Sequence, residues 1–198
     1  MTSFESQYSQ SRGDPASLSW ADLTPNPNMI RWLETSRIDG ANRRALVIGC
    51  GLGDDAEELS RRGFTTTAFD ISPTAIQWCL QRFPDTDVRY IAADLFHIPG
   101  AWRESFDFVL ESYTLQVLAA GIRRQAIPLI ADFVAPGGTL LLIARGRDHE
   151  DPPGESPWPL TREELGLFVR RDLAEISFQD YMDNEDPPVR RFMVTYQR

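Results

Sequence analysis

The sequence contains no lysine, since all 20 of its basic residues are arginine. This absence excludes mechanisms that depend on a lysine amine, such as the phosphate-binding lysine of P-loop proteins and the Schiff base that holds pyridoxal phosphate. The remaining charge is mainly acidic, with 29 aspartates and glutamates and a net charge of −9 at pH 7. Because nucleic acids bind to basic surfaces, we expect no nucleic-acid partner.

Cysteine and histidine are also scarce. The two cysteines, Cys50 and Cys79, and the two histidines, His97 and His149, lack the spacing typical of metal ligands, so we predict no metal site. Two isolated cysteines indicate a reducing compartment, and we predict a cytoplasmic protein. The polar start of the chain lacks the apolar segment of a signal peptide. No apolar run is long enough to span a membrane, so we expect no membrane association.

The length of 198 residues suits one α/β domain. Residues 1–17 are rich in serine and glutamine without a hydrophobic period, and we predict a flexible N-terminal arm. Residues 18–198 are predicted to form a single domain, in which 18–40 supply two short cap helices. The charged, proline-rich segment 145–160 is longer than most connections in a compact domain, which predicts an active-site lid.

Apolar strand-like segments alternate with helical ones after residue 44, which predicts a doubly wound, mainly parallel sheet. Strands are expected at 45–48, 65–69, 88–92, 106–110 and 139–144, and helices at 55–62, 73–82 and 122–133. Ser72 and Thr161 are predicted helix N-caps, and Gly63 a helix end. Pro136-Gly137-Gly138 predicts a turn, and segments 175–182 and 189–197 fit an antiparallel hairpin.

The main local motif is Gly49-Cys50-Gly51-Leu52-Gly53, which stands directly between the first predicted strand and a helix. Glycines at this point let the backbone approach a ligand at the carboxyl end of the sheet. A pyrophosphate at the following helix start would be repelled by Asp54 and Asp55, whereas S-adenosylmethionine carries cationic groups there. The motif therefore favours S-adenosylmethionine over a dinucleotide.

Acidic residues follow the next three strands. Asp70 ends the second strand, where a carboxylate accepts hydrogen bonds from ribose hydroxyls, and Asp94 follows the third, where an acid accepts the adenine amino group. Glu111 ends the fourth strand. We predict a cofactor site at these strand ends, formed by Gly49, Cys50, Gly51, Gly53, Asp55, Asp70, Ile71, Asp94, Leu95 and Glu111.

These motifs resemble the class I S-adenosylmethionine-dependent methyltransferases, from about residue 18 onward. Val47-Ile48-Gly49-Cys50-Gly51-Leu52-Gly53-Asp54-Asp55, Phe106–Glu111 and the prolines around Asp148 and Trp158 look most like the branch of thiopurine S-methyltransferase and the thiol and halide methyltransferases. The resemblance implies a Rossmann-like seven-stranded sheet of order 3-2-1-4-5-7-6 with strand 7 antiparallel and helices on both faces.

The same resemblance implies methyl transfer to a small molecule, such as a thiol, a halide or a related soft nucleophile. Such acceptors need no base, whereas an oxygen or nitrogen acceptor would need one. His149 and Tyr113 are the candidate catalytic residues, with Glu111 a further candidate base. Trp20, Tyr113, Arg145 and Trp158 are predicted to bind the substrate.

Two alternatives stay open, a non-catalytic S-adenosylmethionine-binding protein and an NAD(P)-dependent oxidoreductase. We expect a monomer or homodimer.

Overall fold

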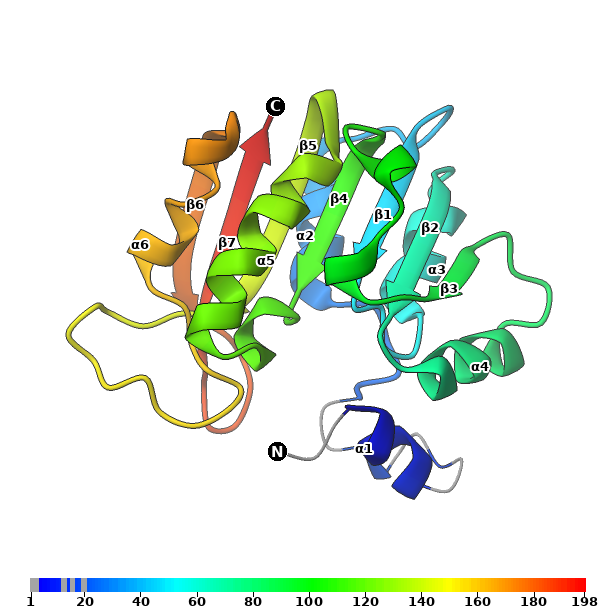
Figure 1. Cartoon of the computed structure of the whole chain (residues 1–198), viewed down its shortest axis with the longest axis horizontal. Helices are drawn as coiled ribbons and strands as arrows, with labels where there is room; N and C mark the ends of the chain where they lie inside the picture. Colours follow the sequence, from blue (N-terminus) through cyan, green and yellow to red (C-terminus); the bar gives the residue numbers. More distant parts are fainter. Residues whose placement is uncertain (1–3, 12–13, 15–16, 19–20) are drawn as a thin grey trace. The chain divides into compact units, whose positions relative to one another are not determined.

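The computed structural model describes residues 4–11, 14, 17–18 and 21–198. The chain forms two compact units, residues 1–99 and 100–198. Figure 1 shows the course of the chain through both. None of the helices in the described ranges has the length and apolar character needed to cross a bilayer.

The first unit is built on three parallel strands, with β2 paired to both β1 and β3. Helix α3 packs on β1 and β2, and α4 packs on β2 and β3. The elements, in chain order, are α1 (Phe4–Gln10), α2 (Pro27–Ser36), β1 (Arg44–Ile48), α3 (Asp54–Arg61), β2 (Thr65–Asp70), α4 (Pro73–Arg82), β3 (Arg89–Ala92) and the 3₁₀ helix η2 (Leu95–His97).

The second unit carries four strands. Strand β5 pairs parallel with β4, while β7 runs antiparallel to both β5 and β6. Its elements are η3 (Gly100–Trp102), β4 (Phe106–Ser112), η4 (Leu115–Val117), α5 (Ala120–Phe133), β5 (Val134–Arg145), α6 (Arg162–Leu165), η5 (Val169–Arg171), β6 (Ala174–Met182) and β7 (Arg190–Gln197).

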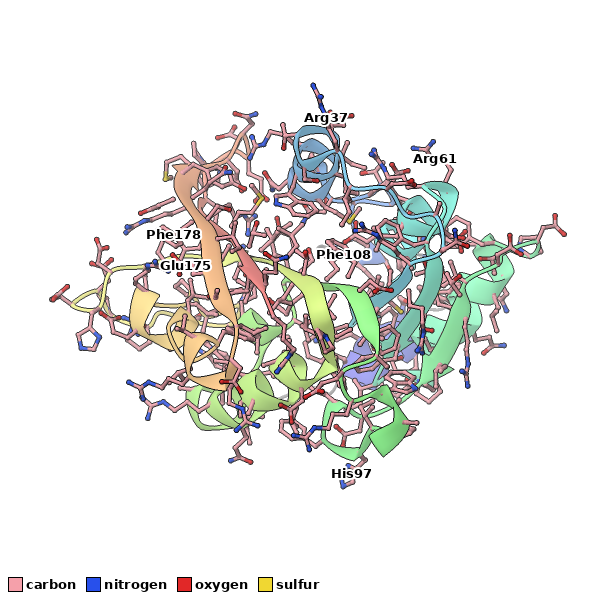
Figure 2. The ribbon with its side chains drawn as sticks, turned by 90° about the horizontal axis from the view of Figure 1, so that it is seen from above. Arg37, Arg61, His97, Phe108, Glu175 and Phe178 are labelled. Atoms are coloured by element: carbon pink, nitrogen blue, oxygen red, sulfur yellow. The ribbon has the colours of Figure 1, made fainter. Side chains whose placement is uncertain are left out.

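The strand order is β3-β2-β1-β4-β5-β7-β6, and this confirms the predicted fold class, including the antiparallel last strand. The central strands are the most apolar ones. Leu140, Leu141, Leu142, Ile143 and Ala144 of β5 are fully buried, as continuous apolar runs in a sheet covered on both faces should be. Figure 2 shows Phe108 within the sheet.

The predicted helix signals are confirmed at three positions. The Ser72 hydroxyl accepts a hydrogen bond from Ala75 N at the start of α4. Thr161 forms a capping box with Glu164 at the start of α6. Gly63 follows α3 with a φ of 91°, the left-handed conformation that glycine adopts without strain.

Two segments differ from the expectations. The sequence of residues 1–17 has no clear helical period, yet Phe4–Gln10 forms α1. The predicted turn at Pro136-Gly137-Gly138 lies inside β5, where Phe106 pairs with Val134 and Phe108 with Thr139. The extra residues of β5 therefore form a bulge, which the alternation of polar and apolar residues along a strand does not predict.

Candidate functional site

The glycine motif forms a tight turn between β1 and α3. Gly49, Gly51 and Gly53 have φ values of 59°, 53° and 92°, which lie in the left-handed region. A side chain at Gly53 would also lack space, because its Cβ would lie 2.5 Å from Tyr90 Oη. The turn is thus a backbone-lined cradle at the carboxyl end of β1.

Asp70 at the end of β2 is bonded to this turn. Its Oδ2 accepts from Gly51 N at 3.0 Å, and its Oδ1 accepts from Ser72 N at 2.9 Å. The side chain is buried, and this burial raises the pKa of the Asp70 carboxyl. Ile71, the next residue, is 57% exposed, an apolar side chain beside a buried acid. We call the Gly49–Gly53 turn with Asp70 the glycine–Asp70 clasp.

The two acids at the start of α3 have different partners. Asp54 forms two hydrogen bonds with Arg82, at 2.7 and 2.8 Å, and Arg82 also donates to Leu52 O. Asp55 accepts from Asn26 N at 2.6 Å, and burial raises the pKa of its carboxyl to about 6. The prediction that both acids repel an anion is therefore corrected: Arg82 compensates the charge of Asp54, and the argument now depends on Asp55.

The cysteines lie against the same turn. Cys79 Sγ donates to Gly51 O at 3.3 Å. The hydrogen bond to Cys79 and burial raise the pKa of the Cys50 thiol, so Cys50 is held as a thiol and is a poor nucleophile. Within the described part of the chain, no group of three or more His, Cys, Asp and Glu residues could hold a metal ion.

Asp94 caps η2 after β3. Its carboxylate accepts from Phe96 N at 3.0 Å and lies 2.9 Å from His97 Nδ1. His97 points away from the ribbon in Figure 2, and its side chain is 81% exposed. Leu95 is half-buried. The glycine turn, Asp70, Ile71, Asp94 and Leu95 all stand at or after the carboxyl ends of the three strands of the first unit.

Glu111, in the second unit, is completely buried near the end of β4. Its Oε1 accepts from Thr114 N at 2.8 Å and from Leu115 N at 2.7 Å, which fixes the chain as it enters η4. Its Oε2 is buried and has no hydrogen-bond partner among the described residues. Burial raises the pKa of this carboxyl to about 7.

Tyr113 lies two residues further on, with a φ of 65° that is unusual for a residue with a Cβ. The Arg191 guanidinium stands 4.6 Å from the centre of the Tyr113 ring. Arg191 is buried and paired with Asp183 and Glu185. Strained backbone of this kind is frequent at functional sites, although it does not identify one alone.

Gln116 holds both ends of the predicted lid. Its Oε1 accepts from Arg145 N at 2.7 Å, and its carbonyl accepts from Trp158 N at 2.6 Å. The sequence reasoning missed this role, because a glutamine in a loop carries no signal of its own.

Arg145 and His149, two further predicted site residues of the second unit, lie in different surroundings, one in a strand and one exposed. Arg145 stands opposite Arg191 in the β5–β7 pairing. The His149 side chain is 70% exposed, and its Nδ1 lies 3.7 Å from Glu163 Oε2. Trp20, predicted to bind substrate, lies outside the described residues.

Comparison with known proteins finds similarity to methyltransferases. Residues 45–138 match a family model described as a methyltransferase domain. The 2-heptyl-1-hydroxyquinolin-4(1H)-one methyltransferase of Mycobacteroides abscessus is 26% identical over 176 residues, which cover 85% of this chain and 74% of that protein. The probable thiol methyltransferase 2 of Arabidopsis thaliana is 27% identical over 63% of this chain and 55% of its own length.

A solved structure has the same fold. The Burkholderia thailandensis 1,6-didemethyltoxoflavin-N1-methyltransferase, with S-adenosylhomocysteine bound, superposes with a TM-score of 0.74 at 19% identity, over 98% of this chain and 86% of that one. The likeness to the thiol methyltransferase branch depends on distant similarity, and that branch stays a prediction. Residues 45–138 thus match methyltransferase domains, and the strand order is the one that the resemblance to class I, S-adenosylmethionine-dependent methyltransferases implies.

Proposed function

We propose that the protein transfers a methyl group from S-adenosylmethionine to a small-molecule acceptor. The observation that carries the proposal is the glycine–Asp70 clasp, in which Gly51 N donates to Asp70 Oδ2 at 3.0 Å, inside the segment that matches methyltransferase domains. The clasp joins a side-chain-free turn to a buried acid, the two features that an adenosyl amino acid requires.

The residues of the first unit fit this cofactor. A Cβ at Gly53 would meet Tyr90, so the turn can keep its open backbone only with glycine. We expect the turn, with Cys50, to hold the amino-acid end of the cofactor and Asp70 to bind the ribose hydroxyls. Asp55 adds negative charge for the cationic groups. Exposed Ile71 and half-buried Leu95 offer apolar contacts for adenine, and Asp94 accepts its amino group.

When bound, the cofactor supplies a methyl group on a sulfonium, which is already activated for displacement. The protein then has to bind and orient the acceptor, which accounts for most of the rate in such transfers. Tyr113, Arg145 and Trp158 are the proposed substrate-binding residues. His149, in the predicted lid, remains a candidate catalytic residue.

Two acceptor classes are open to test. The thiol, halide or soft-nucleophile proposal is supported by the likeness to the Arabidopsis thiol methyltransferase. The relative from Mycobacteroides abscessus covers more of this chain and is named for a hydroxyquinolone, which favours a hydroxylated heteroaromatic ring. We take the second class as the main proposal because it agrees with Glu111.

Glu111 has the properties of a general base for a hydroxyl acceptor. Its Oε2 has no partner among the described residues, and its pKa of about 7 leaves it able to take a proton near neutral pH. A thiolate or halide would need no such base. We therefore propose that, of the two roles predicted for Glu111 from the sequence, it acts as a base on the acceptor and does not bind the cofactor.

The test is a methyl-transfer assay with a panel of thiols, halides and hydroxylated heteroaromatics, read as methylated product by mass spectrometry. We expect product with at least one class. With a hydroxylated acceptor, Glu111→Gln should lower kcat by roughly 100-fold, within the range for general-base catalysis. The exposed Glu34→Gln, on α2, should have no effect.

Other outcomes have definite meanings. Transfer to thiols or halides alone, unaffected by Glu111→Gln, would restore the soft-nucleophile proposal and exclude Glu111 as a base. Tight cofactor binding without turnover on the whole panel would support a non-catalytic S-adenosylmethionine-binding protein instead.

A further inference from the structure

The N-terminal helix α1 is attached to the start of α4 by one acidic side chain. Glu5 Oε2 accepts from Ser72 Oγ at 2.6 Å and from Thr74 N at 3.3 Å, and Glu5 Oε1 accepts from Thr74 Oγ1 at 2.6 Å. A carboxylate at a helix N-terminus is favoured by the free N–H groups and the helix dipole. Figure 1 shows α1 beside α4.

This attachment leads directly to the glycine–Asp70 clasp. Ser72, which donates its hydroxyl to Glu5, also donates its backbone N–H to Asp70 Oδ1 at 2.9 Å. Asp70 in turn accepts from Gly51 N. A continuous chain of hydrogen bonds therefore connects Glu5 of α1 to the turn that we propose binds the cofactor.

Tyr8 packs on the same region from the next turn of α1. It is 2% exposed, and its ring meets the Trp78 ring edge-on, with centroids 5.8 Å apart. The same buried cluster contains Ala75 of α4 and Leu52, which stands between Gly51 and Gly53. The side of α1 that faces the unit thus covers the glycine turn as well as α4.

The hydroxyl of Tyr8 is held neutral in this position. Burial and then the negative charge of Asp70 raise the pKa of Tyr8, with smaller effects of Cys50, Cys79 and Glu5. The Tyr8 phenol therefore stays neutral, in the same buried cluster as Leu52 of the glycine turn.

We propose that α1 is part of the S-adenosylmethionine site, with Tyr8 as a positioning residue that acts through Asp70 and the glycine turn, and with Glu5 as the contact that holds α1 in place. The inference rests on the proposed function, and it adds an element that the sequence assigned to a flexible arm. It concerns cofactor affinity and makes no claim about the acceptor.

The experiment is calorimetric titration with S-adenosylhomocysteine of the wild type, Glu5→Gln, Tyr8→Phe and Tyr8→Ala, with Gln10→Ala as the control. Gln10 lies on the exposed side of α1. Glu5→Gln weakens the hydrogen bonds that the Glu5 carboxylate accepts from Ser72 and Thr74, and it should lower the affinity for S-adenosylhomocysteine roughly tenfold. Tyr8→Ala should weaken it at least as much, Tyr8→Phe should weaken it less, and Gln10→Ala should bind as the wild type does.

Amide hydrogen exchange of residues 4–10 is a second measurement, which distinguishes a local effect on α1 from general destabilisation of the protein. S-Adenosylhomocysteine should slow exchange there in the wild type but not in Glu5→Gln. If the wild type binds while Glu5→Gln and Tyr8→Phe bind equally tightly and exchange in α1 is unchanged, this inference is wrong and the proposed function stands. If folded wild-type protein does not bind, both are wrong.

Discussion

Asp70 shows at the scale of a single residue what sequence reasoning can and cannot supply. An acid at the end of the second strand could be predicted from its place after an apolar run. Its two backbone donors, Gly51 N and Ser72 N, could not, because they depend on how the turn after β1 folds. Asp70 was predicted only to bind a ligand. In the structure it also stabilises the glycine turn through these two hydrogen bonds.

Gly53 gives a direct test of the turn. Its φ of 92° would strain the backbone of an alanine. The alanine Cβ would also clash with Tyr90 Oη, which would lie 2.5 Å away. Gly53→Ala should lower the free energy of unfolding by about 2 kcal/mol or more, measured by urea denaturation. Adding Tyr90→Phe should recover part of the loss, because it removes the clashing oxygen.

The matched control is Gly121→Ala. Gly121 lies in α5, and a Cβ at this position would have no atom within 4 Å, so alanine there should stabilise the protein slightly. A Gly53→Ala protein as stable as the wild type would contradict the described turn.

Glu111 predicts a pH-dependent stability. Because its folded pKa of about 7 lies above the ordinary value of 4.5, the folded state holds the proton more tightly, and this stabilisation is lost as pH rises through 7. Glu111→Gln keeps an oxygen for Thr114 N and Leu115 N but cannot ionise. The variant should gain up to about 3 kcal/mol relative to wild type at pH 8, and little at pH 5. An equal difference at both pH values would argue against a buried, unpaired Glu111.

At the scale of elements, hydrophobic pattern was a good guide where burial decides the structure. The predicted helix at 73–82 matches α4, and the strand at 65–69 is one residue shorter than β2. α1 was missed because its buried side rests on two residues of a short helix, Phe4 and Tyr8, whose spacing of four is a weak signal in a polar segment. The predicted lid has its ends fixed by Gln116, which no pattern indicates.

Gln116→Ala tests that attachment of the lid. The change removes the acceptor for Arg145 N, a hydrogen bond worth about 1 kcal/mol, while the backbone bond to Trp158 N is retained. Trypsin should cleave after Arg147 roughly fivefold faster than in the wild type, read by mass spectrometry of the fragments. Gln179→Ala, exposed on β6, should leave the rate unchanged. Equal cleavage rates in both variants would exclude Gln116 as the anchor.

At the scale of the whole molecule, all basic side chains are arginines, and some of them bind a carboxylate through two hydrogen bonds at once. Asp54 with Arg82 and Glu175 with Arg162 each form two hydrogen bonds, an arrangement that the planar guanidinium favours. Some acidic residues are therefore neutralised by arginine, and the net charge of −9 comes from the acids that exceed the arginines in number. These two pairs could not be predicted from the sequence, because their partners lie 28 and 13 residues apart.

Opposing groups of acids should give the protein a stability maximum in mildly acidic solution. Hydrogen bonds lower the pKa of Glu5 and Asp180, so their stabilisation is lost as pH falls through those lowered values. Burial raises the pKa of Asp55 to about 6 and of Glu111 to about 7, so their contribution declines as pH rises above their ordinary values of 3.8 and 4.5 and is lost above 6 and 7. The thermal midpoint should therefore peak at about pH 4 and fall on both sides. A midpoint that climbs steadily to pH 8 would contradict the raised pKa values of these two acids.

The most direct measurement of the central claim is a calorimetric titration with S-adenosylmethionine, made on the wild type and on Asp70→Asn. The account predicts saturable binding of one cofactor per chain, and binding at least roughly tenfold weaker in Asp70→Asn, because an amide is a poorer acceptor for ribose hydroxyls and for Gly51 N. No heat of binding from folded wild-type protein, or equal affinity in Asp70→Asn, would contradict it.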